Sequence, residues 1–313
     1  DDAIASGTIQ DSKITWELDG KGWLTISGSG DCSAFTSKDD QPWAEYRSQI
    51  TQVWFDGMES LAIPDLAYWF EDCTNLTTAE IPSTTPVIGR HAFYNCPLLT
   101  KLSIYYGEHT LDSIGEDAFW STGISEVILP DGLKTVGRNA FQYCNDLTKL
   151  VIPQSVESIS GNAFYCSSYS GNKILEIICH NPTPIPLSEQ FANTTYSKLR
   201  IPFGSKDAYY EADYWRDFFT KGTVVVGVGE QTLAALEITP TEEMQEGEFT
   251  VTINNSNEGA VVRYYIMKDW KMFKEISEYT GPITISETGN IDIYAIAENG
   301  DKCSPEAHQH YYV

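Results

Sequence analysis

The central part of the chain repeats one pattern of apolar and polar positions. Its clearest copy contains Val136, Gly137, Ala140, Phe141 and Cys144, followed by apolar residues at positions 147, 150 and 152. The repeat phenylalanines are Phe70, Phe93, Phe119, Phe141, Phe164 and Phe191, so successive copies are 23, 26, 22, 23 and 27 residues apart. A period this regular predicts a solenoid in which each copy forms one coil.

Each coil is predicted to contribute one short strand to a parallel sheet. Two inward apolar positions alternate with outward positions in every copy, as expected of a half-buried strand. The seven predicted inward pairs are Val53/Phe55, Ala79/Ile81, Leu102/Ile104, Val127/Leu129, Leu150/Ile152, Ile177/Cys179 and Leu199/Ile201. Four pairs are followed directly by a proline, namely Pro82, Pro130, Pro153 and Pro202. These prolines are expected to end their strands, because proline has no N–H for the ladder.

The glycine, the phenylalanine and the cysteine of the repeat are assigned to the other side of each coil. There the glycine is expected to allow a sharp turn, and the stacked phenylalanines are expected to form a spine in the core. Four cysteines follow a repeat phenylalanine by two or three residues: Cys73, Cys96, Cys144 and Cys166. We predict that they are reduced, buried repeat positions without a redox or metal role.

Both ends of the solenoid have predicted caps, which would keep the terminal coils from exposing apolar core to water. Residues 8–28 alternate around two glycine-containing turns and predict a β-hairpin, and residues 1–49 are assigned to an N-terminal capping region. Residues 205–218 predict an aromatic helix at the far end. The solenoid with this C-terminal cap is assigned to residues 50–226.

A separate β-sandwich is predicted over residues 227–313, after a short linker at 227–231. Short strands at regular spacing, separated by polar turns, are typical of that architecture. The predicted strands are Leu236–Ile238, Phe249–Ile253, Val261–Met267, Ile283–Ile285, Ile291–Ala297 and His308–Val313. The whole chain is therefore expected to be mainly β, with short helical and turn segments.

Charge and composition narrow the classes of partner. The formal net charge of −24 opposes binding to nucleic acid and to anionic lipid surfaces. No apolar run approaches the length that spans a bilayer, so a soluble chain without membrane insertion is expected. The chain begins at Asp1 with neither a methionine nor a charged-then-apolar leader, as expected of a mature or trimmed protein whose targeting segment is missing.

Motifs for catalysis and metal binding are not found in the sequence. The chain has no His-Glu-x-x-His, Gly-x-Ser-x-Gly or phosphate-binding Gly-x-x-x-x-Gly-Lys motif, and no Cys-x-x-Cys pair. The five histidines are scattered except for His308 and His310. Paired carboxylates for glycoside hydrolysis stay open, since an acidic chain has many. We predict a protein that is not an enzyme and that binds no cofactor or metal.

The repeats read Ile-Gly-x-x-Ala-Phe-x-x-Cys-x-x-Leu-x-x-Leu-x-Ile-Pro and resemble those of the BspA-like leucine-rich-repeat proteins of bacterial surfaces. Two flanking segments support this resemblance: the hairpin with Pro42 and Trp43, and the terminal Ile201-Pro202 with Trp215. The resemblance covers roughly residues 7–225, although the copies at 70 and 191 lack the alanine and the copy at 119 lacks the cysteine. It implies a secreted or surface-anchored bacterial protein that binds a protein or a glycan, with a host extracellular molecule among the expected partners.

The C-terminal region has a second resemblance. Tyr279–Ile285 and Ile291–Ala297 are similar to the immunoglobulin-like C-terminal domain that accompanies chitobiases and related hexosaminidases. The usual Asp-Gly-Ser-x-Pro-Thr turn of that family is replaced here by the turn residues Lys268–Lys271. The resemblance therefore implies an immunoglobulin-like fold, without the glycan contacts of the family.

The outward strand positions give the candidate binding surface. One outward column is Gln52, Thr78, Lys101, Glu126, Lys149, Glu176 and Lys198, and its alternating charges predict a ladder of ion pairs. The next column is Trp54, Glu80, Ser103, Ile128, Val151, Ile178 and Arg200, with Tyr105 and His180 in a third. Ile128, Val151 and Ile178 would lie side by side on the concave face, where contiguous exposed apolar residues mark recognition sites.

The predicted ligand-binding set is therefore Trp54, Tyr105, Ile128, Val151, Ile178 and His180. Two plainer explanations for the aliphatic residues stay open: β-branched residues favour strands, or the second domain folds back over them. At the level of function, a structural spacer or an accessory carbohydrate-binding module is the alternative to an adhesin. The sequence leaves the oligomeric state open.

Overall fold

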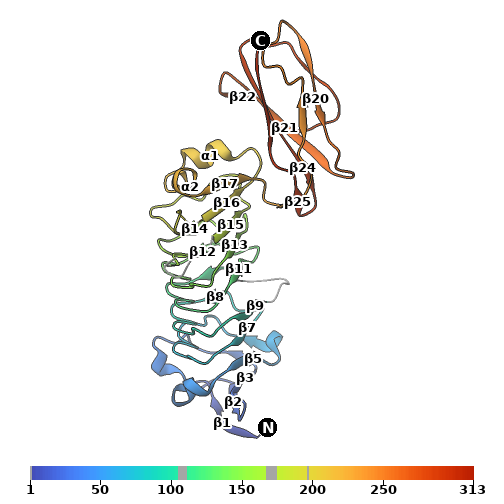
Figure 1. The fold of residues 1–313 in the computed structure, drawn as a ribbon. Coiled ribbons are helices and arrows are strands. Elements are labelled where there is room, and N and C mark those ends of the chain that lie inside the picture. Colours follow the sequence, from blue (N-terminus) through green and yellow to red (C-terminus); the bar gives the residue numbers. More distant parts are fainter. Residues whose placement is uncertain (1, 105–110, 167–174, 196) are drawn as a thin grey trace. The chain divides into compact units, whose positions relative to one another are not determined.

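The computed structural model describes residues 2–104, 111–166, 175–195 and 197–313. The chain forms two compact units: Asp1–Leu199 with Glu211–Thr223, and Arg200–Tyr210 with Val224–Val313. Strands dominate both units, and the helices are few and short (Figure 1).

The repeats of the first unit stack as coils of a solenoid, as predicted. Their strands on the open face are β5 (Gln52–Phe55), β7 (Thr78–Ile81), β9 (Lys101–Ile104), β11 (Glu126–Ile128), β13 (Lys149–Ile152), β15 (Leu175–Cys179) and β16 (Ser197–Ile201). Two-residue strands line the opposite side in one parallel sheet: β8 (Val87–Ile88), β10 (Ser113–Ile114), β12 (Thr135–Val136) and β14 (Ser158–Ile159).

The open face is not the single sheet that the repeat predicts. It consists of one sheet that ends at β9 and a second that begins at β11, and in the described part of the chain these two strands do not pair. The opposite sheet runs unbroken through the same coils, because β8, β10 and β12 pair in sequence. Leu102 and Ile104, predicted to be buried, are consequently only half-buried.

The repeat phenylalanines form the predicted spine, and all of them are buried. Phe119 lies between Phe93 and Phe141, at ring-centroid distances of 5.1 and 4.8 Å, with the planes within 8° of parallel. Phe164 continues the stack at 5.0 Å from Phe141. The spine therefore gives every coil apolar contact with both of its neighbours.

The repeat glycines do not form the sharp turn that the sequence predicts. They are required because a side chain at their positions would collide with the preceding coil. Gly115 and Gly137 do not have left-handed backbone conformations; instead, a Cβ at either would lie 2.8 or 2.7 Å from a backbone nitrogen of the preceding coil. The left-handed position falls two residues later, at His91, Asp117, Asn139 and Asn162. Histidine, aspartate and asparagine are among the residues that tolerate this conformation best. The glycine thus permits close stacking of the coils.

The repeat cysteines act as small buried donors. The thiol of Cys96 donates to the carbonyl of Phe70 over 3.2 Å, and that of Cys144 to the carbonyl of Phe119 over 3.2 Å. In the coil without a cysteine, the hydroxyl of Thr122 takes the position and lies 3.1 Å from Sγ of Cys144. All seven cysteines are free thiols; of the four in the repeats, only Cys166 is not fully buried.

These thiols are expected to be unreactive in the native protein. Burial raises the pKa of Cys73 to about 12 and that of Cys144 to about 11, and it raises the pKa of Cys96 well above its ordinary value. Since the thiolate is the reactive form, Ellman's reagent at pH 7.5 should leave these three unmodified. Guanidinium should then expose all seven. Fewer than seven titratable thiols in the unfolded chain, or rapid native labelling of the three, would contradict this prediction.

The N-terminal cap extends the first face sheet. The predicted hairpin is β2 (Ile14–Asp19) with β3 (Trp23–Gly28), and β3 pairs in parallel with β5. A further strand, β1 (Ala3–Thr8), pairs with β2 and was not predicted. The other short elements here are β4 (Gly30–Asp31), β6 (Leu61–Ala62) and the 3-10 helices η1 (Lys38–Asp40), η2 (Ala44–Gln49) and η3 (Met58–Ser60).

The single helix predicted at 205–218 is two helices, α1 (Lys206–Glu211) and α2 (Arg216–Lys221). Tyr214 adopts a left-handed conformation with φ of 66°, which an α-helix cannot contain. A buried tryptophan lies beyond each end of the phenylalanine spine. Trp43 stacks on Phe70 at 5.9 Å, and Trp215 lies 5.1 Å from Phe191.

The C-terminal unit contains two sheets around one core, as expected of a β-sandwich. Its strands are β17 (Thr223–Val226), β18 (Glu230–Gln231), β19 (Glu237–Thr239), β20 (Phe249–Asn254), β21 (Val261–Lys268), β22 (Lys271–Glu278), β23 (Ile283–Ile285), β24 (Asn290–Asn299), β25 (Lys302–Cys303) and β26 (Ala307–Tyr312). The larger sheet has the order β18-β25-β24-β21-β22 with β26 on β24, and the smaller one has the order β19-β20-β23. Val251 and Ile285 of the small sheet share a core with Ile266 and Ile293 of the large one.

Strand β22 was not predicted, and it forms an edge of the larger sheet. Most of its side chains are exposed, so its sequence carries no alternation of buried and exposed positions. Its pairing with β21 is interrupted by two register shifts. Such irregularities and the lysines of β22 discourage pairing of a free edge with other chains.

Candidate functional site

Three of the predicted site residues lie side by side on the open face. Ile128 is in register with Val151, and Val151 with Ile178. Their neighbours Val127, Leu150 and Ile177 are buried, so the three point outward, with Ile128 41% exposed and the other two half-buried. We refer to Ile128, Val151 and Ile178 as the aliphatic patch.

Ion pairs run beside the aliphatic patch in the neighbouring column. Glu126 lies 3.7 Å from Lys149, and Glu176 lies 4.0 Å from Lys198. The predicted ladder is thus present within the second sheet. It does not continue to Lys101, because β9 and β11 are separated there. Exposed pairs of this kind contribute only about 0.2–1 kcal/mol each, so their main effect is a polar border to the patch.

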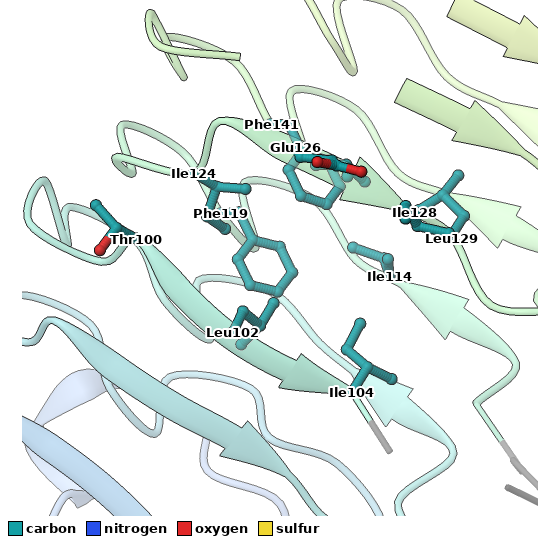
Figure 2. A pocket seen from close by; sticks show the side chains of 11 residues that line it. Thr100, Leu102, Ile104, Ile114, Phe119, Ile124, Glu126, Ile128, Leu129 and Phe141 are labelled. Carbon is teal, nitrogen blue, oxygen red and sulfur yellow. The ribbon is translucent and has the colours of Figure 1, made fainter. Parts of the chain in front are cut away.

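A cavity of about 210 Å³ opens where the two sheets separate, next to the aliphatic patch. Figure 2 shows its lining, with side chains of β9 on one side, those of β11 on the other and Phe119 between them. The lining residues are Thr100, Leu102, Ile104, Ile114, Phe119, Ile124, Glu126, Val127, Ile128, Leu129 and Phe141. Ile128 therefore belongs both to the patch and to the cavity wall.

Sequence reasoning missed this cavity, although one signal was present. The step from Phe93 to Phe119 is 26 residues, longer than the steps on either side of it. The added length falls within the coil at which the two face sheets separate. Repeat length alone does not mark the interruption, however, because the step from Phe164 to Phe191 is 27 residues, and β13, β15 and β16 pair there without a break.

The other predicted site residues are not part of the aliphatic patch, although His180 follows Ile178 by two residues. Trp54 is in β5 of the first face sheet, across the opening from the aliphatic patch, and its ring is near that of Trp23. His180 is exposed just after β15, where its backbone N–H donates to the carbonyl of Ile152 over 3.0 Å. Tyr105 lies outside the described residues. The structure thus brings together three of the six residues.

The chemistry of the site is that of a contact surface. Among the described residues that line the cavity, Glu126 is the only ionisable one. Within the described ranges, no group of three histidine, cysteine or acidic residues has a metal-binding arrangement. Nor is any helix of those ranges long and apolar enough to cross a membrane.

The comparisons with known proteins concern the repeats. Residues 66–181 match the model of the BspA type leucine rich repeat region, in six copies. No curated protein matches the chain.

Among solved structures, a leucine-rich repeat protein from Bacteroides ovatus is 19% identical, with a TM-score of 0.38 over 62% of this chain and 55% of that one. The leucine-rich repeat protein of T. pallidum is 17% identical, with a TM-score of 0.37, and the match covers 66% of this chain and 99% of that protein. A leucine rich cell surface protein from Faecalibacterium prausnitzii is 14% identical, with a TM-score of 0.28, and the match covers 64% of this chain and 71% of that protein.

The match thus spans about half the length of the Bacteroides ovatus protein. These TM-scores are below 0.5, so the fold rests on the strand topology described above. The coils that carry most of the aliphatic patch and the cavity fall within the matched residues. Residues 66–181 of this chain are a BspA-type leucine-rich-repeat region.

Proposed function

We propose that this chain is a non-catalytic binding protein of the bacterial cell surface, with a role in adhesion, and that its ligand is a protein. Proteins with BspA-type repeats are surface and binding proteins. Solenoids in general offer extended binding surfaces, because stacked coils present one strand face over many repeats. The chain is taken to be exported, and a host extracellular protein is the proposed partner.

The observation that carries the proposal is the aliphatic patch beside an open apolar cavity. Three aliphatic side chains in register give a contiguous contact area, and the charged pairs next to them give it a polar border. Protein interfaces combine an apolar centre with a polar rim in this way.

The cavity supplies an anchor point for the ligand. Apolar cavities of about 150 Å³ already bind benzene, so a volume of 210 Å³ accommodates a large aliphatic or aromatic side chain. Interface energy is concentrated where such a side chain fills a desolvated pocket. We expect the bound protein to insert one apolar side chain between β9 and β11, against Leu102 and Phe119.

The test is a double variant, Ile128→Asp with Ile178→Asp, screened against an array of host extracellular proteins. Two carboxylates on either side of Val151 should abolish binding to any protein that the wild-type chain captures, because they would be desolvated on binding. Circular dichroism should stay unchanged, since both side chains point outward.

Thr135→Asp with Ser158→Asp is the matched control, because these neighbouring exposed residues of β12 and β14 lie on the opposite sheet and take the same added charge. It should bind as the wild type does. If the patch variant binds as tightly as the wild type, the ligand site is elsewhere, and the region around the exposed Trp270 becomes the next candidate.

A further inference from the structure

A second, chemically different surface lies on the other sheet of the open face. Trp23 of β3 and Trp54 of β5 are 41% and 36% exposed, and their ring centroids are 6.3 Å apart with planes inclined at 49°. Both point outward, because the alternate residues Leu24 and Val53 are fully buried. We refer to Trp23 and Trp54 as the indole pair.

Both rings of the indole pair have side-chain contacts on the protein surface. The Nε1–H of Trp54 donates to the side-chain oxygen of Gln52 over 3.0 Å. The ammonium group of Lys21 lies 5.7 Å from the centroid of the Trp23 ring. Contacts that hold aromatic groups in place before a ligand arrives lower the entropy cost of binding.

Hydrogen-bonding side chains surround the indole pair. In the strand register Thr25 lies beside Trp54, Thr78 beside Gln52, and Glu17 beside Thr25. Farther along the hairpin the hydroxyls of Thr15 and Ser27 are 3.2 Å apart. An aliphatic ligand would desolvate these groups without replacing their hydrogen bonds, which is unfavourable.

The charges around the indole pair are nearly balanced, although the chain as a whole carries −24. Glu17, Asp19 and the buried Glu80 of β7 are countered for the most part by Lys21 of the hairpin and by Lys101, which is in register with Thr78. Lys21 also already provides a cation at the Trp23 ring. A strongly charged ligand of either sign therefore finds no complementary surface here.

We propose that the indole pair is a binding site for a neutral glycan. A pyranose ring has a face of C–H groups with slight positive charge, which stacks on the electron-rich face of an indole. Its hydroxyl groups can exchange hydrogen bonds with the flanking threonines and with Glu17. The site needs no charge on the ligand, in agreement with the balance around it.

The glycan site is separate from the surface proposed for the protein ligand. Beyond Trp54 lies Glu80, which is buried and accepts a hydrogen bond from the backbone N–H of Phe55. Ser103 is in register with Glu80, and the interruption between β9 and β11 follows. With about 4.8 Å between neighbouring strands, the aliphatic patch begins on the order of 15 Å or more from the indole pair. Each site can therefore be removed without altering the other.

The experiment is native electrophoresis of the full chain through gels that contain dextran, laminarin, galactomannan or xyloglucan. We expect retardation of the wild-type chain in at least one gel, with Kd read from its dependence on polysaccharide concentration. Trp23→Ala with Trp54→Ala should weaken that binding about tenfold or more, with an unchanged circular dichroism spectrum because both side chains lie on the outward face of the sheet. Trp54→Phe, which keeps an aromatic face, should retain part of the affinity.

Two controls make the outcome specific. Trp270→Ala removes the most exposed tryptophan of the chain, at 74%, and should be retarded as the wild type is. Ile128→Asp with Ile178→Asp should also be retarded as the wild type is. Loss of glycan binding can then be distinguished from loss of protein binding at the aliphatic patch. The proposal is overturned if none of the four gels retards the wild type. It is also overturned if the double tryptophan variant migrates as the wild type does.

Discussion

Replacing Phe141 by alanine should lower the free energy of unfolding by about 3–5 kcal/mol. The ring is buried and is stacked on both faces, at 4.8 Å from Phe119 and 5.0 Å from Phe164. The variant loses this apolar contact and leaves a void, which coils held by a continuous sheet on the opposite side can close only in part. In a solenoid each coil contacts only its neighbours, so the loss should weaken two coil interfaces together.

Chemical denaturation followed by far-ultraviolet circular dichroism measures this effect. Phe141→Leu is the informative companion, because it keeps most of the buried volume while losing the ring stacking, and it should cost less than half as much. Tyr143→Ala is the surface control in the same coil, since Tyr143 is exposed. A destabilisation below about 1 kcal/mol for Phe141→Ala would show that the spine is not a principal source of stability.

Replacing Trp43 by alanine should destabilise the N-terminal end of the solenoid by a similar amount, about 3–5 kcal/mol. The indole is fully buried, is stacked at 14° on Phe70, and packs against Trp16 and Trp69. Its Nε1–H donates to the carbonyl of Trp69 over 3.0 Å. Alanine removes the ring that covers the first spine phenylalanine and leaves that buried carbonyl without this donor.

Trp43→Phe keeps an aromatic ring next to Phe70 but removes the indole N–H and part of the buried ring volume. It should cost less than Trp43→Ala, with about 1–3 kcal/mol arising from the buried carbonyl that loses its donor. Trp215 gives an independent check at the other end, where the indole N–H donates to the carbonyl of Ile185 over 2.8 Å. If Trp43→Ala unfolds at the same denaturant concentration as the wild type, the N-terminal cap does not stabilise the solenoid.

The register of the aliphatic patch could be predicted from the sequence for a simple reason. Side chains alternate between the two faces of a strand, so the buried residues Val127, Leu150 and Ile177 fix the direction of their neighbours. The recurring apolar motif then identifies the equivalent position in each coil, which brings Ile128, Val151 and Ile178 together. The same logic predicts the phenylalanine spine, because equivalent positions of successive coils lie above one another.

Elements without that alternation could not be predicted. Strand β22 is exposed along most of its length, so residues 271–278 show no buried face. The helix predicted at 205–218 has apolar residues throughout, yet a left-handed residue at Tyr214 divides it. In both cases the pattern of apolar and polar residues, which is the main signal of secondary structure in a sequence, does not indicate the backbone conformation.

The sequence by itself determined the coils of this protein, the inward and outward sides of their strands, and the core, because all three follow from local periodicity. Only the tertiary structure decided where neighbouring strands pair and where they separate. The cavity exists because β9 and β11 diverge while β8, β10 and β12 stay paired behind them. The indole pair exists because the hairpin strand β3 joins the sheet in parallel with β5. Both sites depend on the docking of segments distant in the chain, which no local pattern records.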